Sequence, residues 1–393
     1  MISPSAVSQL YQRGLLDLDM PLADPYLLGP EFAQNGKATI TARNLLLHNA
    51  GFPADPFPGY GASSFGCPAT NSSSHPPLTF SCDSLILQSV LAQTLKNPVG
   101  AVFLYSDLSM ITLSFTLGKL VQQLKLVGAS DLLPACQTQA AASPAQPQYL
   151  CWYEAYIRLH VFAYNPSSWQ VPAFLPPDGS SCPSCNIAPA YYDSDYRHQQ
   201  MWGEVSDANA YAMGGISGHA GVFANAPALA NLMSNILFAS SDSSFVNAST
   251  VAYFIKAQNL SQVRLPSTLL ALPPSLPRNT LDARLMLRSA ELARFGLGYQ
   301  QLRDGHVPWL RKLQRTHVHT HRCAACLRLS RACVLTTAAG YTGTQICADP
   351  VSGVISILLT NRCYPDDKGL SVIATVRRAF SNAVLAALSA ETD

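Results

Sequence analysis

The sequence predicts an α+β fold, in which helices cover an antiparallel sheet. Residues 344–348 and 354–360 are apolar, β-branched runs joined by the short turn 349–353, so they should pair as an antiparallel hairpin. The hairpin is followed by a predicted helix whose apolar side consists of Ile373, Val376, Phe380, Val384 and Leu388. A hairpin followed by a C-terminal helix favours helices packed on an antiparallel sheet over a parallel, doubly wound arrangement.

Two further helices are predicted ahead of the hairpin. One opens the chain over residues 1–14. Asn225 is placed to cap the other, with Pro227 in its first turn. The apolar face of this second helix consists of Leu229, Leu232, Met233, Ile236 and Leu237.

Three stretches have the composition of loops. Residues 134–148 are rich in Ala, Gln and Pro without an apolar period, and residues 171–186 carry repeated Pro, Gly, Ser and Cys. Residues 265–277 are rich in Leu and Pro. No segment repeats at a fixed period, so neither a solenoid nor a propeller is predicted.

Length and charge limit the class of protein. A chain of 393 residues is long enough for one large domain or two modest ones. Charged residues make up 12% of it, against roughly 25% in ordinary soluble domains, and the mean hydropathy is +0.12. The net charge of +2 argues against nucleic acid or an anionic membrane as the main partner.

No membrane or secretory segment is predicted. The longest apolar candidate, residues 108–118, is far shorter than the ~20 residues of a membrane-spanning helix. Residues 1–17 lack a basic leader and a continuous apolar block, so a cytoplasmic location is the default. The eleven cysteines are therefore expected to be mostly reduced and buried.

Four stretches, in matching order and spacing, resemble one family of enzymes. They are ITARNLLLHNAGFP at 40–53, PVG at 98–100 with YSDL at 105–108, the segment 203–223 from GEV to GGISGHAGVF, and GYTGT at 340–344 with DP at 349–350 and LLTNR at 358–362. This set is similar to motifs of the β-lactamase-related serine hydrolases, which include penicillin-binding proteins and class C β-lactamases. The resemblance extends over most of the chain.

The resemblance implies a β-lactamase/transpeptidase-like fold, with an antiparallel sheet beside a mainly helical lobe. It implies a single domain over residues 1–393, in which 1–240 form the helical lobe with insertions at 134–148 and 171–186. Residues 340–393 would supply the sheet hairpin and the closing helix. The strands that precede the nucleophile in the family would be missing.

The second motif implies two catalytic residues. In the family, a serine acylates the substrate while a lysine one helical turn later and the tyrosine of this motif move its proton. Tyr105 occupies the tyrosine position, and Asp107 stands where many relatives have Asn and would orient the lysine by a charge-assisted hydrogen bond. A phenol with an ordinary pKa of ~10 acts as a base only beside a cation. The alternative is that Tyr105 is a satisfied core tyrosine.

The third motif implies an oxyanion and substrate-binding strand formed by Gly340, Tyr341 and Thr342, with the backbone N–H of Tyr341 as a donor. Ala338 and Ala339 stand where the family has His and Thr, so the polar pair that would recognise the substrate carboxylate or ester is absent at these positions.

Two histidines lie in the matched stretches. His219, in a glycine-rich turn, is a candidate substrate contact, with a purely structural role as its alternative. The position of His48 is usually described in the family as packing beneath the cleft.

The Ser-x-x-Lys box is absent, and residues 1–19 resemble the stretch that directly follows its lysine. The sequence therefore predicts a serine hydrolase acting on an ester, amide or peptide bond, inactive as written because the nucleophile and its lysine are missing. The alternative is a catalytically dead relative that binds peptides or assembles with partners. The expected ligand is a small molecule or a peptide, and the oligomeric state is left open.

Residues 305–339 form an atypical segment. They contain no acidic side chain and include the string His317-x-His319-x-His321-x-Cys323-x-x-Cys326. This string suits zinc in part, but a second ligand pair at the usual spacing is lacking. The segment is a translated intron or local frameshift, a solvated insertion, or the patch of a zinc- or RNA-binding adapter. We predict no metal, no cofactor and no nucleic acid.

Overall fold

The computed structural model describes residues 1–67, 82–142, 146–164, 171–175, 187–256, 338–349, 353–366 and 370–390. These residues fall in two compact units. The first comprises the described part of Met1–Phe254 together with residues 363–366, and the second comprises the other described residues. The loop predicted at 265–277 and the segment 305–337 lie outside the described residues.

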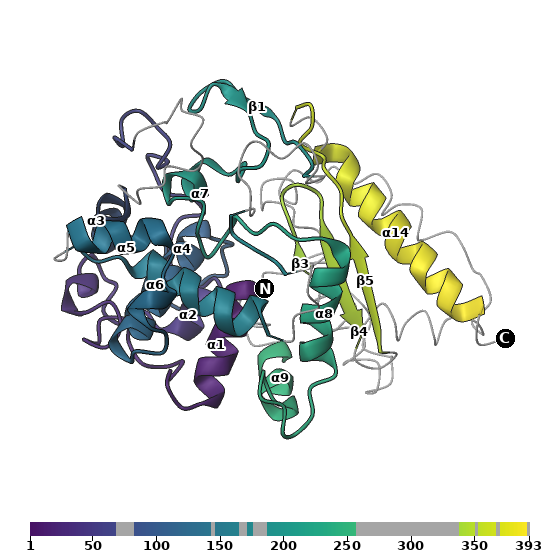
Figure 1. Cartoon of the computed structure of the whole chain (residues 1–393), viewed down its shortest axis with the longest axis horizontal. Helices are drawn as coiled ribbons and strands as arrows, with labels where there is room; N and C mark the ends of the chain where they lie inside the picture. The colour runs from purple at the N-terminus through teal and green to yellow at the C-terminus, as the bar shows by residue number, and fades with distance from the viewer. Residues whose placement is uncertain are drawn as a thin grey trace, which may run out of the picture. The chain divides into compact units, whose positions relative to one another are not determined.

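The first unit is mainly helical (Figure 1). Its helices are α1 (Ile2–Gln12), η1 (Pro30–Ala33), α2 (Ala42–Leu46), α3 (Asp83–Ala92), α4 (Asp107–Gln123), η2 (Ala129–Asp131), α5 (Pro134–Ala142), α6 (Tyr149–Tyr156), η3 (Ile157–Phe162), α7 (Ala208–Ala212), α8 (Ala226–Leu237) and α9 (Ala248–Ile255). A short antiparallel pair, β1 (Tyr192–Asp193) and β2 (Gln199–Gln200), accompanies them.

Helix α4 forms the core of this unit. Its side chains are buried along most of its length, with Leu113, Phe115 and Leu117 almost fully removed from solvent. Helix α6 packs directly against it, and a Cβ at Gly118 would lie only 1.8 Å from the carbonyl oxygen of Tyr149. This close packing fixes the helix whose first residue, Asp107, belongs to the predicted site.

Two predicted helices of this unit are confirmed. Helix α1 covers most of residues 1–14. Helix α8 begins after Asn225, whose side chain accepts a hydrogen bond from the Ala228 amide at 2.9 Å. Local sequence determines both, because caps and apolar periodicity act within one or two turns.

The loop predicted at residues 134–148 is wrong for its first nine residues, which form α5. Pro134 occupies the first position of the helix, where its missing N–H is harmless, and Ala and Gln favour the helix that follows. The helix carries almost no apolar face, so periodicity could not reveal it. Cys136 fastens it to α6 through a disulfide with Cys151.

The expectation of mostly reduced cysteines is wrong for the described cysteines of the helical unit before residue 164. Cys67 pairs with Cys82, and Cys136 pairs with Cys151. Each pair is separated by 15 residues and becomes close only through the packing of helices and loops. Spacing alone does not predict such pairs, because disulfide formation depends on the distance between Cα atoms in the fold.

The second unit contains a sheet with strand order β3 (Ala338–Ala339), β4 (Gln345–Asp349) and β5 (Val354–Leu358), antiparallel throughout. The predicted hairpin is confirmed, with Gln345 paired to Leu358 and Asp349 paired to Val354. The predicted closing helix is α14 (Leu370–Ala390), which packs along β5 (Figure 1). The fold class is therefore α+β, as the sequence predicts.

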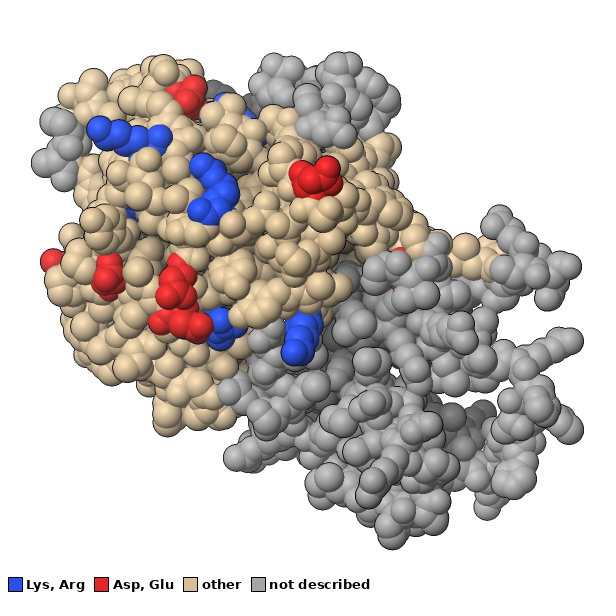
Figure 2. Space-filling view, turned by 90° about the horizontal axis from the view of Figure 1, so that it is seen from below, with Lys and Arg blue, Asp and Glu red and all other residues tan. Residues whose placement is uncertain are grey.

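Charged side chains are sparse on the described part of the face drawn in Figure 2. In the view of Figure 2, Lys and Arg are interspersed with Asp and Glu on the described part of the face, with no broad patch of one sign. Among the described residues, no helix combines the length and apolar character needed to cross a bilayer.

Candidate functional site

The Tyr105–Asp107 segment is held in place by the first matched stretch. The backbone N–H of Leu104 donates to the His48 carbonyl at 2.8 Å, and the N–H of Asp107 donates to the Ala54 carbonyl at 2.7 Å. Between them, the Ser106 hydroxyl donates to the Pro53 carbonyl at 2.6 Å. Two stretches about 55 residues apart in sequence are thus joined by hydrogen bonds along the start of α4.

His48 supports this segment from below. Its Nδ1 accepts a hydrogen bond from the Ser106 amide at 3.1 Å, and its ring lies 4.8 Å from that of Tyr105. Burial lowers the pKa of His48 to about 4, so the ring is neutral at pH 7 and acts as an acceptor. A supporting role fits the expectation that this histidine packs beneath the site.

Tyr105 is 59% exposed and is therefore not a core tyrosine. Partial burial of its hydroxyl, together with the negative charge of Asp107, raises the pKa of Tyr105 above its ordinary value. The phenol donates a hydrogen bond to the Asp107 carboxylate, and the Asp207 and Asp55 carboxylates add to the shift. In this arrangement Tyr105 is a proton donor, and it needs a neighbouring cation before it can act as a base.

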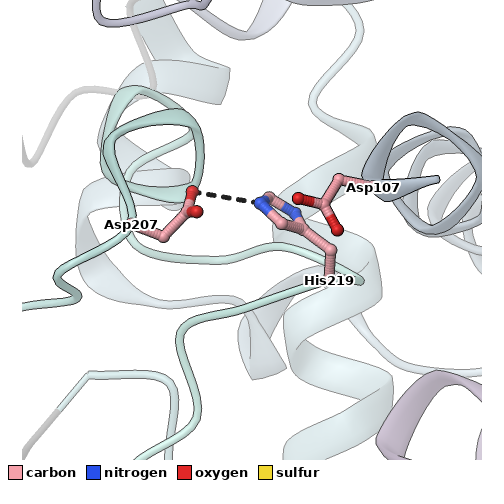
Figure 3. A group of neighbouring side chains, drawn as sticks. All are labelled: Asp107, Asp207 and His219. Atoms are coloured by element: carbon pink, nitrogen blue, oxygen red, sulfur yellow. Dashed lines mark hydrogen bonds and ion pairs between the residues drawn. The ribbon is translucent and has the colours of Figure 1, made fainter. Parts of the chain in front are cut away.

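Asp107 forms a cluster with His219 and Asp207 (Figure 3). His219 Nε2 lies 3.0 Å from Asp207 Oδ1, and its Nδ1 lies 2.6 Å from the hydroxyl of Ser217. In Figure 3 the two carboxylates face the imidazole ring from opposite sides. Asp107 comes from the first turn of α4, Asp207 caps α7, and His219 lies in the loop between α7 and α8.

Glycine-rich backbone places His219 beside α4. A Cβ at Gly218 would lie 2.1 Å from the Met110 carbonyl oxygen, so only glycine permits this approach. Gly221 has φ +106°, and a Cβ there would lie 2.5 Å from the Gly215 carbonyl oxygen. The glycines of this matched stretch thus have a packing reason: they bring the His219 loop against the start of α4.

Burial and the charges of neighbouring groups shift the pKa values of all three residues of the cluster. Burial and the neighbouring carboxylates raise the pKa of Asp107 to about 6, although His219 opposes the shift. Burial works against the charge of His219, but the hydrogen bond and the charge of Asp207 prevail and raise its pKa. The same contact outweighs burial at Asp207 and lowers its pKa.

Sequence reasoning placed Asp107 and His219 in the site but missed Asp207. Its signal was the helix cap: Asp207 is followed by the alanine-rich turn of α7, and its Oδ1 accepts from the Ala210 amide at 2.7 Å. In a sequence, the pattern of a capping residue indicates a structural role and not a part in a functional site. Its contact with His219, twelve residues later, depends on the fold.

The third motif forms the turn between β3 and β4 in the second unit. The Gly340 amide donates to the Thr344 carbonyl at 3.0 Å, and Arg362 donates from its backbone to the Thr342 carbonyl at 2.9 Å. The Arg362 guanidinium lies 3.9 Å from the centre of the Tyr341 ring, which is 63% exposed. A site shared by Tyr105 and Tyr341 stays a prediction, because they belong to different units.

The chain matches a known family and several curated proteins. The family model named Beta-lactamase matches residues 5–123, a segment that contains the 40–53 signature and the Tyr105 box. A protein of Escherichia coli K12 described as "Putative D-alanyl-D-alanine carboxypeptidase" is 24% identical over 373 residues, covering 91% of this chain and 65% of that protein. A protein of the same description from Salmonella typhi is 23% identical over 366 residues, covering 91% and 66%. The chain thus spans about two thirds of the length of these relatives.

Two solved structures are also similar. Simvastatin synthase (LovD) of Aspergillus terreus, in its LovD6 mutant, has a TM-score of 0.49 at 15% identity, covering 98% of this chain and 78% of that one. An octameric penicillin-binding protein homologue from Pyrococcus abyssi has a TM-score of 0.40 at 16% identity, covering 67% and 48%.

The family model over residues 5–123 and the curated relatives support a β-lactamase-related serine hydrolase family for this chain. The family predicted from the four motifs is confirmed. The family-model match, over residues 5–123, lies in the helical unit that carries Tyr105 and Asp107.

Proposed function

We propose that this protein carries the site of a serine hydrolase that cleaves an ester, amide or peptide bond through an acyl-enzyme. The observation that carries the proposal is the exposed Tyr105 side chain, whose hydroxyl lies beside Asp107 at the start of α4, within the segment that matches the family. An acidic side chain and a phenol at this place suit the binding of a cationic proton carrier, the role that the family gives to lysine.

Each residue has a distinct role in the proposal. Asp107 orients the cation, and the cation in turn lowers the pKa of Tyr105 so that its hydroxyl can exchange protons with the nucleophile and the leaving group. The backbone N–H of Tyr341, in the Gly340–Thr342 turn, would donate to the oxyanion. The His219 ring lies between the Asp107 and Asp207 carboxylates.

The sequence of 393 residues contains no serine followed three residues later by lysine. The proposed chemistry therefore needs a nucleophile that these residues do not include, and the chain as written is expected not to acylate. The description of the curated relatives suggests peptides that end in a D-amino acid as the substrate class. A catalytically dead relative that binds such peptides is the alternative.

Labelling with a fluorescent penicillin and with a fluorophosphonate tests the proposal. The 393-residue chain should remain unlabelled, whereas a product extended upstream by a Ser-x-x-Lys segment should be labelled at that serine. In the extended product, Tyr105→Phe should slow labelling by about 10²–10⁴-fold, the usual contribution of a positioned proton carrier. Labelling of the shorter chain would contradict the expected inactivity. Peptide binding by the extended product without any labelling would favour the dead relative.

A further inference from the structure

The Asp107, His219 and Asp207 side chains bring together the donor atoms of a metal site. One ligand atom from each residue lies within 4.8 Å of the other two, a span little wider than the about 4.2 Å between opposite ligands of an ion bound at about 2.1 Å. The His219 Nε2 to Asp207 Oδ1 distance of 3.0 Å equals the separation of neighbouring ligands at right angles around such an ion. Imidazole nitrogen and carboxylate oxygen together suit first-row divalent ions.

Ser217 provides the outer support that metal-binding histidines need. Its hydroxyl is buried and lies 2.6 Å from His219 Nδ1. When this hydroxyl accepts the Nδ1 proton, the lone pair of Nε2 points toward the Asp207 carboxylate. Metal-ligating histidines almost always use their second nitrogen in this manner, which fixes both the tautomer and the ring orientation. The His219 side chain is only 2% exposed, so the ring is held in a single place.

The negative charge around the His219 ring favours the binding of a cation. Three carboxylates, those of Asp55, Asp107 and Asp207, act on the region around the His219 ring. The Arg197 guanidinium also acts on Asp207, but it is already bonded to Asp193 and to two backbone carbonyls.

The cluster also has a way in from solvent. The Asp207 side chain is 34% exposed, and its second oxygen, Oδ2, accepts no hydrogen bond from the described residues. Asp107 is half-buried and lies beside the exposed Tyr105. An ion held by these residues would therefore keep positions open to water.

We infer that Asp107, Asp207 and His219 form a binding site for one divalent transition-metal ion, with Ser217 as its outer support. The site goes beyond the acyl transfer proposed above and does not depend on it. The alternative is that the cluster serves only to form the Asp207–His219 ion pair. In that case the three residues would bind no metal.

Titration with Mn²⁺ tests the inference, because the electron paramagnetic resonance signal of free Mn²⁺ disappears when the ion binds. The chelator-treated 393-residue chain should bind about one Mn²⁺. His219→Gln and Asp107→Asn should each weaken binding at least about tenfold, and Ser217→Ala should weaken it about 10–100-fold, as loss of an outer partner does. Matched controls are His198→Gln and Asp195→Asn, which change exposed residues of the same types.

The choice of Mn²⁺ as the probe and a cysteine variant together exclude the thiols of residues 305–339 as the metal ligands. Mn²⁺ prefers oxygen and imidazole to thiolate, so a Cys323→Ser/Cys326→Ser protein should bind it unchanged. Asp207→Asn retains the acceptor oxygen that caps α7, and circular dichroism should confirm that it is folded while it binds weakly. The inference is overturned if the wild-type chain binds no Mn²⁺, or if folded His219→Gln and Asp107→Asn proteins bind as tightly as the controls.

Discussion

Asp207 and His219 are joined at 3.0 Å through the same carboxylate oxygen that caps helix α7. One atom therefore links the start of a helix to the ring of the site, and the helix cap fixes the position of that oxygen. The Ala210 amide, at 2.7 Å, is the helix donor that this oxygen satisfies.

The two functions of Asp207 can be separated by substitution. Asp207→Ala removes the cap and the partner of His219, whereas Asp207→Asn keeps an oxygen for the Ala210 amide and removes the charge. Because a lost cap costs about 1 kcal/mol, Asp207→Ala should unfold at lower urea concentration than Asp207→Asn by about that difference in free energy. Equal midpoints and slopes for the two variants would show that Asp207 does not stabilise α7.

Asp83 should make the stability of the helical unit depend on pH. It opens α3, and its two buried oxygens have no hydrogen-bond partner in the described structure. Burial raises its pKa well above the ordinary value. Folding therefore favours the protonated form of Asp83. The contribution of this group to the free energy of unfolding is fully present below its unfolded pKa of about 3.9, and it is lost as pH rises through the folded pKa.

Asp83→Asn should remove this dependence. The variant should gain stability relative to the wild type as pH rises from 4 to 8, reaching about 1–3 kcal/mol at the upper end, because a neutral amide avoids a buried charge. Urea unfolding at a series of pH values measures the difference. A difference that stays flat across this range would mean that the Asp83 carboxylate is as well solvated in the folded state as in the unfolded one.

Local sequence signals predicted the elements, and the site was predicted in part. Asn225, the residues of the hairpin and the apolar side of α14 act on their near neighbours, so cap chemistry and periodicity locate them. Tyr105, Asp107 and His219 came from resemblance, and the structure brings these three together.

The features that sequence missed depend on contacts between distant segments. Asp207 joins the site only after the glycines at 218 and 221 bring His219 back to α4. Helix α5 lacks an apolar face, so its packing is set by the Cys136–Cys151 bond rather than by periodicity. The number of residues between two groups in the sequence does not determine the distance between two thiols, or between a carboxylate and a ring, in the fold.

The Cys136–Cys151 disulfide should stabilise the helical unit. It closes a loop of about 15 residues, for which chain entropy gives about 3 kcal/mol. The Cys136→Ser/Cys151→Ser protein should therefore melt at lower temperature than the wild type under oxidising conditions. Added reductant should decrease this difference in melting temperature. Peptide mapping without reduction should recover the linked peptides. A wild-type protein purified under oxidising conditions with both thiols free would contradict the pairing.

Gly118→Ala offers a sharp test of the packing beneath the site. In an exposed helix this change stabilises by about 1 kcal/mol, because alanine has the higher helix propensity. Inside α4 the new Cβ would lie 1.8 Å from the Tyr149 carbonyl oxygen, so α6 must move and the protein should lose about 1–3 kcal/mol. The sign of the change in unfolding free energy therefore decides whether α4 and α6 approach this closely.

Gly128→Ala is the matched control for that substitution. Gly128 has φ −82°, which alanine readily adopts, and the atom nearest its added Cβ is the end of the flexible Asp131 side chain at 3.1 Å. This control should change the unfolding free energy by less than about 1 kcal/mol. If Gly118→Ala is as stable as Gly128→Ala, the two helices lie farther apart than described. The buried face of α4 then no longer explains how Asp107 is fixed beside Tyr105.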